Sequence, residues 1–271
     1  DNDYKGEPIM NRIENTLAKL KEDGKKALIT FITAGDPDLE TTEKLVMKMF
    51  ENGADIIEIG VPFSDPIAEG KTIQAASLRA LASGQTNLLT IFEMVERLRA
   101  KTDKPLILMM YVNTIFRFGT ERFFTLCREK GIDGVIVPDL PYEEQDEILP
   151  YAEKNGVISI SMVTPASHSR IAKISADSKG FLYCVSSTGV TGTRSSFETD
   201  FDSFFGEIRK SCSIPAMVGF GISSPEQAAK MSSYCDGVIV GSAIVKIVGE
   251  YGRESAEKVG EFTSALKKAI S

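Results

Sequence analysis

Histidine is almost absent from this sequence, which contains His168 and no other histidine among its 271 residues. The four cysteines form no C-x-x-C pair, so a zinc or haem site lacks candidate ligands. No apolar run reaches the roughly 18 residues of a membrane-spanning helix, and the N-terminus has no signal-peptide core. These absences predict a cytoplasmic protein without a metal site, whose cysteines are reduced thiols.

An excess of basic residues is also missing. The chain has 38 acidic and 31 basic residues, which gives a net charge of −7 at pH 7. Such a charge argues against binding to nucleic acid or to an anionic membrane surface. If the substrate carries a phosphate, mainly backbone N–H groups have to hold it rather than a basic patch. The composition, with 42% hydrophobic residues, is that of a globular protein with a large core.

Short runs rich in β-branched residues alternate along the chain with helical stretches. The predicted strands are residues 27–33, 55–61, 106–111, 134–138, 157–163, 181–186, 216–220 and 237–241. The principal predicted helices are residues 11–22, 38–52, 72–83, 88–101, 120–130, 142–155 and 254–270. Most strands are followed by a helix, which is the pattern of parallel βα units.

Eight such units in about 250 residues predict a (β/α)8 barrel, preceded by an extra helix at residues 11–22. No linker divides the chain, so residues 1–271 are expected to form one domain, with residues 1–9 as a tail before a natural start at Met10. The alternative is an open doubly wound sheet, which favours a G-x-G-x-x-G turn after the first strand. That turn is absent, and Gly219-Phe220-Gly221 lacks the third glycine.

The predicted strand 55–61 contains one carboxylate, Glu58, where an aliphatic residue would be expected. Burying a carboxylate costs several kcal/mol unless it is paired or its pKa rises until it holds a proton. A raised pKa suits a general acid or base. The loop that follows contains two prolines, which prevent a helix, and it carries Asp65 and Glu69 to the same end of the strand. The alternative, a paired core acid beside solvated loop acids, stays open at this point.

Three glycine-containing loops are expected at the carboxyl ends of the last strands, where barrel enzymes place their active sites. They are residues 186–196, 219–224 and 241–245, and Ser242 is placed to begin a short helix. Glycines allow the backbone to approach an anion, and a helix N-terminus offers free N–H groups. These loops therefore predict a phosphate site, with loop 186–196 closing over the substrate. The alternative is that the glycines serve tight turns only.

Two kinds of aldolase chemistry find no support in the sequence. An imine-forming enzyme needs a lysine at a strand end, but Lys71, Lys104 and Lys246 lie elsewhere. A metal-dependent enzyme needs ligands that a single histidine does not supply, and His168 is expected at an exposed helix start. Acid/base chemistry by carboxylates remains, with Tyr183 as a possible helper.

Several motifs then resemble one known family, the tryptophan synthase alpha subunit. They are E-I-G-V-P-F-S-D-P-I-A-E-G at 58–70 followed by T-I-Q, M-Y-V-N at 110–113, P-D-L-P at 138–141, Y-C-V-S-S-T-G-V-T-G at 183–192, G-F-G-I at 219–222 and G-S-A-I-V-K at 241–246. The matches run in the family's order from about Met10 to the C-terminus, so the resemblance covers nearly the whole chain.

The resemblance implies a retro-aldol cleavage of indole-3-glycerol phosphate to indole and glyceraldehyde 3-phosphate. By this likeness Glu58 is the main acid/base, Glu69 is the second acid and Tyr183 is the active-site tyrosine. The family usually has aspartate at the position of Glu69 and often has proline at the position of Lys71. The longer Glu69 keeps the charge but moves it by about one bond length.

The resemblance also assigns binding and coupling residues. Phosphate binding falls to Gly192, Gly221, Gly241 and Ser242, and contact with the indole ring falls to Phe31, Ile73, Met109 and Phe220, while Thr191 is a further substrate-binding residue. Asp65, Asn113 and Asp139 match positions that couple the subunit to its partner.

That partner is a beta subunit containing pyridoxal phosphate, in a tetramer of two alpha and two beta chains, whereas no cofactor is expected in this chain. Two alternatives stay open. One is a free-standing indole-glycerol phosphate lyase, and the other is a phosphate-binding barrel that acts mainly as an allosteric activator of a partner. The presence of Glu58 favours an enzyme, since a pure activator could lose it.

Overall fold

The computed structural model describes residues 11–67, 69–185, 201–219 and 221–271. In this part of the chain, nine strands form one sheet in the order β5-β4-β3-β2-β1-β9-β8-β7-β6, and every recorded strand pair is parallel. The strands are β1 (Ala27–Thr33), β2 (Ile56–Gly60), β3 (Leu106–Met109), β4 (Gly134–Ile136), β5 (Ile158–Ser159), β6 (Met162–Val163), β7 (Leu182–Val185), β8 (Ala216–Gly219) and β9 (Gly237–Val240).

The sheet closes on itself through its two outermost strands, since only Ile160 and Ser161 separate β5 from β6. The N–H of Ile160 donates to the carbonyl of Val135 on one side, at 2.9 Å. The N–H of Tyr183 donates to the carbonyl of Ser161 on the other side, also at 2.9 Å. The predicted strand 157–163 is therefore two short strands, because the chain changes partner from β4 to β7 in its middle. With this strand counted as one barrel position, the (β/α)8 barrel is confirmed.

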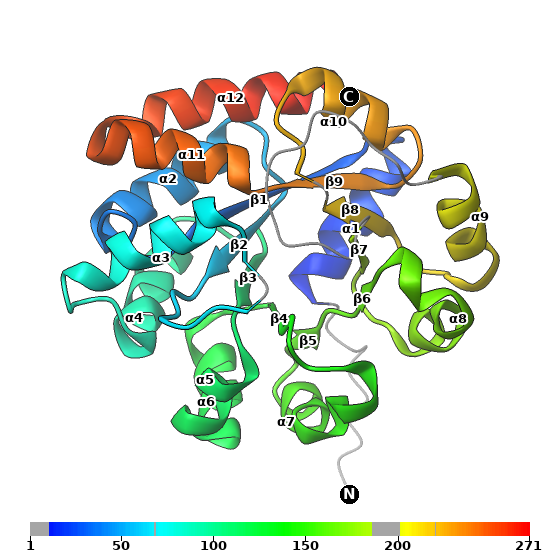
Figure 1. Ribbon diagram of the computed structural model, residues 1–271, viewed down its shortest axis with the longest axis horizontal. Helices are drawn as coiled ribbons and strands as arrows, with labels where there is room; N and C mark the ends of the chain where they lie inside the picture. The colour runs from blue at the N-terminus through cyan, green and yellow to red at the C-terminus, as the bar shows by residue number, and fades with distance from the viewer. Residues whose placement is uncertain (1–10, 68, 186–200, 220) are drawn as a thin grey trace, which may run out of the picture.

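The described residues contain twelve α-helices, of which all but the first surround the strands as an outer layer, as Figure 1 shows. They are α1 (Arg12–Glu22), α2 (Leu39–Glu51), α3 (Lys71–Ala82), α4 (Leu88–Arg99), α5 (Val112–Phe118), α6 (Thr120–Lys130), α7 (Leu149–Lys154), α8 (His168–Asp177), α9 (Phe201–Ser211), α10 (Pro225–Ser232), α11 (Ser242–Tyr251) and α12 (Ser255–Ala269), with short 3-10 segments η1 (Tyr142–Glu147), η2 (Pro165–Ser167) and η3 (Gly252–Glu254).

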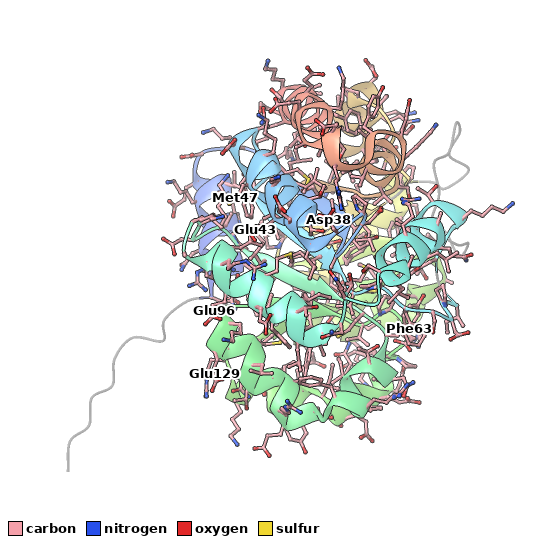
Figure 2. All side chains as sticks on the ribbon, turned by 90° about the vertical axis from the view of Figure 1, so that its left-hand side faces the viewer. Asp38, Glu43, Met47, Phe63, Glu96 and Glu129 are labelled. Carbon is pink, nitrogen blue, oxygen red and sulfur yellow. The ribbon has the colours of Figure 1, made fainter. Side chains whose placement is uncertain are left out.

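The helix boundaries follow local chemistry. Helix α2 begins after Asp38, labelled in Figure 2, whose carboxylate accepts from the N–H of Thr41 at 2.7 Å and so caps the first turn. The predicted helix 142–155 is wrong as one element, because η1 ends and α7 begins around Ile148. Pro150 explains the break, since proline lacks an N–H and its ring clashes with the preceding turn of a continuous helix.

Successive side chains of each strand point alternately into the barrel and toward the helices, so the hydrophobic core has two parts. On β2, Ile56 faces the barrel interior, while Ile57 and Ile59 face the helices. The interior contains mainly isoleucines, and Ile13 and Leu17 of α1 pack against them. Burying such a side chain contributes about 1.5–3 kcal/mol to the stability of the fold. Helix α1 therefore covers one end of the barrel and also stabilises it. The extra N-terminal helix is thus part of the barrel core.

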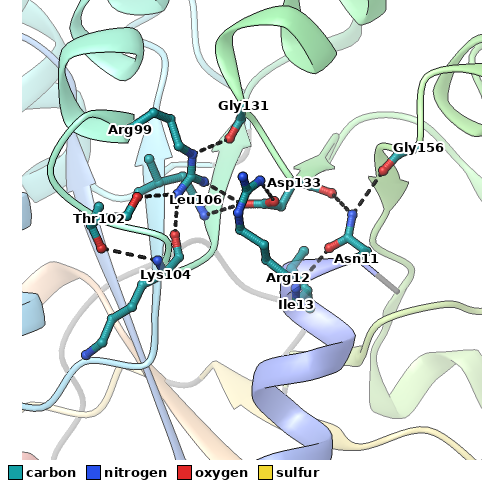
Figure 3. A network of polar contacts seen from close by, with 10 residues as sticks. All are labelled: Asn11, Arg12, Ile13, Arg99, Thr102, Lys104, Leu106, Gly131, Asp133 and Gly156. Carbon is teal, nitrogen blue, oxygen red and sulfur yellow. Dashed lines mark hydrogen bonds and ion pairs between the residues drawn. The ribbon is translucent and has the colours of Figure 1, made fainter. Parts of the chain in front are cut away.

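A polar network holds α1 in that place (Figure 3). The carboxylate of Asp133, which is 3% exposed, accepts from Arg12, from Arg99 and from the N–H of Leu106. The side chain of Asn11 donates to the carbonyl of Asp133 at 2.9 Å, and its oxygen accepts from the N–H of Ile13. Because Asp133 directly precedes β4, this network lies at the amino ends of the strands.

Candidate active site

Glu58 lies on β2, two residues before its carboxyl end, and it alternates with the outward-facing Ile57 and Ile59. Its side chain therefore points into the barrel. In the strand register, its neighbours are Phe31 on β1 and Ile107 on β3. Glu58 is 0% exposed, so its carboxyl group is removed from water near the opening at the carboxyl ends of the strands.

Neither oxygen of Glu58 has a hydrogen-bond partner among the described residues. Burial raises the pKa of Glu58 from 4.5 to about 8, because desolvation penalises the charged form. The carboxyl group therefore holds a proton at neutral pH. A protonated acid close to neutrality is able both to give a proton and to take one back.

Glu69 lies in the loop between β2 and α3 and is half-buried. Its Oε2 atom is buried and has no partner within the described part of the chain. Desolvation raises the pKa of Glu69 to about 7, so its charged and neutral forms are both populated at neutral pH. The amide of Gln74 on α3 donates to the backbone carbonyl of Glu69 at 2.7 Å. This bond attaches the second acid to the start of the helix.

Tyr183, on β7, has its ring against Gly219 of β8. A Cβ atom placed on Gly219 would lie only 2.5–2.8 Å from that ring, so no larger residue fits there. Burial first, and then the charge of Glu58, raise the pKa of Tyr183 well above its ordinary value. The phenol is thus a neutral hydrogen-bond donor within electrostatic range of Glu58.

An apolar cluster lies beside the acids and combines Phe31 from β1 with Ile73 and Ala76 from α3 and Val245 from α11, while Met109 at the end of β3 packs against it. The ring of Phe31 covers Gly60, where an added Cβ atom would lie 2.5 Å away from it. The predicted indole contacts Phe31, Ile73 and Met109 are therefore together.

The predicted phosphate end is partly described. Ser242 is the first residue of α11, and Gly241 precedes it. A Cβ atom placed on Gly241 would lie 3.3 Å from the Cβ atom of Phe31, so the two residues are in close contact. Gly221 has a positive φ of 58°, a conformation that favours glycine. The first N–H groups of a helix have no intrahelical acceptor, so the start of α11 can receive an anion. Thr191, Gly192 and Phe220 lie outside the described residues.

The three predicted coupling residues occupy different positions. Asp65 is exposed in the loop after β2, and its carboxylate accepts from the hydroxyl of Ser64 at 2.6 Å. Asn113 is exposed on α5. Asp139 follows β4 and accepts from the N–H of Val112 at 2.9 Å, which fixes the start of α5. Asp65 and Asn113 are thus accessible, whereas Asp139 connects the loop after β4 to the start of α5.

Sequence reasoning missed several residues of this region. Gly60 and Gly219 admit the rings of Phe31 and Tyr183, and a glycine inside a strand is a recognised sign of such close approach. The rings of Phe63, labelled in Figure 2, and Tyr111 have centroids 5.0 Å apart and are tilted by 33° to one another. Thr33 is 3% exposed, and its hydroxyl has no partner among the residues described. No pattern in the sequence distinguishes it.

Another concave region lies on the outside of the barrel, between α2 and α12, with a volume of about 570 Å³. Most of its charges are paired, since Glu43 binds Arg97 and Lys101 and Lys48 binds Glu257. We therefore place the site at the barrel opening.

Across the described ranges, no group of three or more His, Cys, Asp or Glu residues could hold a metal ion. No helix in the described part is long and apolar enough to cross a membrane.

Comparison with known proteins identifies the family. The family model for the tryptophan synthase alpha chain matches residues 17–271. The tryptophan synthase alpha chain of Citrifermentans bemidjiense is 51% identical over 263 residues, which are 96% of this chain and 98% of that relative. The structure of tryptophan synthase subunit alpha from Legionella pneumophila has a TM-score of 0.86 at 36% identity and covers 96% of this chain and 98% of its own.

A chain from the structure of the tryptophan synthase complex of Pyrococcus furiosus is also similar, with a TM-score of 0.81 and 36% identity over 89% of this chain and 98% of that chain. The family model covers the barrel strands and includes the two candidate acids Glu58 and Glu69. The chain therefore belongs to the tryptophan synthase alpha chain family.

Proposed function

We propose that Glu58, Glu69 and Tyr183 carry the reaction of this member of the tryptophan synthase alpha chain family, which cleaves indole-3-glycerol phosphate to indole and glyceraldehyde 3-phosphate. The observation that supports this assignment most is the state of Glu58. It is fully buried, has no partner among the described residues and has a pKa of about 8. A fold does not keep so costly a group for stability, and acid/base catalysis gives it a role.

In the first half of the proposed reaction, protonated Glu58 donates its proton to carbon 3 of the indole ring. Ionised Glu69 removes the proton of the ring nitrogen, so the ring stays neutral overall while carbon 3 becomes tetrahedral. The pKa values of about 8 and about 7 suit this division, because near pH 7 Glu58 is mainly protonated and Glu69 is partly ionised.

In the second half, the bond between carbon 3 and the adjacent side-chain carbon breaks. Its electron pair returns to the ring, and the ring nitrogen takes its proton back from Glu69. The hydroxyl group on the side-chain carbon gives its proton to Glu58 as the aldehyde forms. Both acids regain their starting protonation states, so no external acid, base or redox partner is needed.

The substrate is oriented by an apolar surface at one end of the proposed site and by a helix start at the other. Phe31, Ile73 and Met109 provide an apolar surface for the indole ring, and the start of α11 at Ser242 receives the phosphate. Tyr183 remains a neutral donor beside Glu58 and is suited to hold a hydroxyl group of the substrate. The net charge of −7 is consistent with phosphate binding by backbone groups.

The partner and the location belong to the same proposal. We infer that this chain assembles with a beta subunit that holds pyridoxal phosphate, as two alpha and two beta chains, and that it needs no cofactor itself. The similarity to a chain of the Pyrococcus furiosus tryptophan synthase complex supports a partner. A cytoplasmic location agrees with four free cysteines, three of which are buried. Co-elution with a beta subunit would separate this assembly from a free-standing lyase.

The assignment of Glu58 is tested by Glu58→Gln. Glutamine has the same size but cannot carry the proton, so indole formation by the purified chain should fall about 100-fold or more, with substrate binding retained. The matched control is Glu96→Gln on the outside of α4, labelled in Figure 2, which should keep wild-type turnover. Indole release measured at substrate saturation decides, and near-normal turnover of Glu58→Gln would overturn the assignment.

A further inference from the structure

One ion pair near the active site joins a buried carboxylate to a partly exposed arginine and has no part in the mechanism above. Asp36 lies in the loop after β1, and its side chain is 2% exposed. Arg79, on α3, donates to it through both arms of the guanidinium group, from Nε to Oδ1 and from Nη2 to Oδ2, each at 2.8 Å. This two-bond geometry fixes both the distance and the relative orientation of the loop and the helix.

Arg79 also contacts a third element. A Cβ atom placed on Gly249 of α11 would lie 3.0 Å from Nη2 of Arg79, so the guanidinium group packs closely against this helix. Nearer their N-termini, α3 and α11 are held together by apolar packing, since Ala76 and Val245 lie in one cluster. Arg79 thus lies where the loop after β1, α3 and α11 meet.

Each of the two helices leads to one end of the substrate site. Helix α3 begins two residues after Glu69, and Gln74 in its first turns bonds to the carbonyl of Glu69 at 2.7 Å. Helix α11 begins at Ser242, the proposed phosphate end. The distance between the second acid and the phosphate is therefore determined by how α3 lies against α11.

We propose that Arg79, held by Asp36, is a positioning residue that fixes α3 relative to α11 and so places Glu69 at the correct distance from the phosphate-binding helix start. This inference rests on the proposed roles of Glu69 and Ser242. Arginine is suited to the task because its planar fork makes two bonds to one carboxylate, whereas a lysine at the same place makes one flexible contact. A displacement of about 1 Å in a reacting group lowers a rate by up to roughly 100-fold.

The test uses the full chain carrying Arg79→Lys, Asp36→Asn or both changes. Each single variant should lower kcat for indole formation about 10-fold or more, while KM stays within about 3-fold because Phe31, Met109 and the start of α11 do not lie on α3. The double variant should lose no more than the worse single variant, because the two residues act as one unit. The control is Arg97→Lys, which weakens the exposed arginine contact with Glu43 and should leave kcat unchanged.

The pH dependence of kcat gives a second readout, which a purely structural role would not change. If α3 moves away, water reaches Glu69 and its pKa falls from about 7 toward 4.5, so the acidic limb of the profile moves to lower pH. Rates are compared at a temperature at which circular dichroism shows each variant to be folded. If Arg79→Lys does not fold, Asp36→Asn carries the same comparison.

Unchanged kcat in the folded variants, or an unmoved acidic limb, would overturn the proposal. A failure of the underlying function would look different. In that case Glu69→Ala would keep full kcat, whereas failure of the positioning proposal alone leaves Glu69→Ala impaired and the Arg79 and Asp36 variants as active as the wild type.

Discussion

Two buried carboxylates at opposite ends of the barrel have opposite surroundings. Asp133, at the amino ends of the strands, accepts bonds from two arginines and a backbone N–H. Glu58, near the carboxyl ends, is equally buried and has no partner in the described residues. Arg99, which pairs with Asp133, is itself only 11% exposed. At the amino ends of the strands the buried carboxylate is paired, whereas near the carboxyl ends the buried acid lacks a partner among the described residues.

The bonds of Asp133 contribute to stability, whereas the burial of Glu58 costs stability at neutral pH. Asp133 connects α1 to the barrel, so its bonds stabilise the fold. Glu58 has a pKa near 8 in the folded chain against an ordinary value of 4.5, so the folded state binds its proton more tightly than the unfolded state does. Stability should therefore fall as pH rises from about 4.5 to about 8, because ionisation of Glu58 is penalised by burial. Under the proposed function, the fold accepts this cost because Glu58 exchanges a proton with the substrate.

The largest expected effect is the loss of stability caused by Asp133→Asn. The change leaves Arg99 buried without its carboxylate, which costs about 3 kcal/mol of the free energy of unfolding. Urea denaturation followed by circular dichroism measures it. The folded fraction should keep kcat within about 2-fold, since Glu58 is at the other end of the barrel. Glu121→Gln, which removes the highly exposed pair with Lys154, is the control and should change the stability little.

At the other end, Glu69→Ala should lower kcat by about 100-fold at saturating substrate, because no group then accepts the proton of the ring nitrogen. Glu69→Asp should retain much of the activity, since the family usually has aspartate at this position. Neither change should reduce the stability, because Glu69 has an unpaired buried oxygen in the described structure and removing it relieves desolvation. Full activity of Glu69→Ala would show that Glu69 is outside the mechanism.

A smaller effect is expected at the phosphate end. Ser242→Asp places a negative charge at the start of α11, so it should raise KM about 10-fold through repulsion of the phosphate. The thermal stability should be unchanged, because an acidic residue at a helix N-terminus interacts favourably with the helix dipole. Ser242→Ala is the control for loss of the hydroxyl group. A KM for Ser242→Asp that equals that of Ser242→Ala would place the phosphate elsewhere.

Much of the architecture could be predicted from the sequence because the strands read as short apolar runs between glycines and prolines. The strand 27–33 and the helix 120–130 have the bounds observed for β1 and α6. The break between β5 and β6 was not predictable, since it depends on a change of partner strand that leaves no local signal. Helix α5 was missed because it is only seven residues long and only two residues separate it from β3.

The candidate site was predictable only in part. Glu58 could be found because a carboxylate interrupts an apolar strand, and the motifs named Glu69 and Tyr183. The unpaired hydroxyl of Thr33 and the bonds from Arg79 to Asp36 depend on which side chains the fold brings together. Residue type alone does not distinguish these groups from ordinary polar residues at loop ends and on helix surfaces.

The protonation of Glu58 is measured most directly by infrared difference spectroscopy of the wild type and Glu58→Gln across a pH series. The wild type should show a protonated carboxyl band that Glu58→Gln lacks, and that band should disappear with a midpoint near pH 8. This result would establish a buried acid that holds its proton at neutral pH. A midpoint near the ordinary value of 4.5 would mean that Glu58 is ionised under working conditions and would contradict its role as the proton donor.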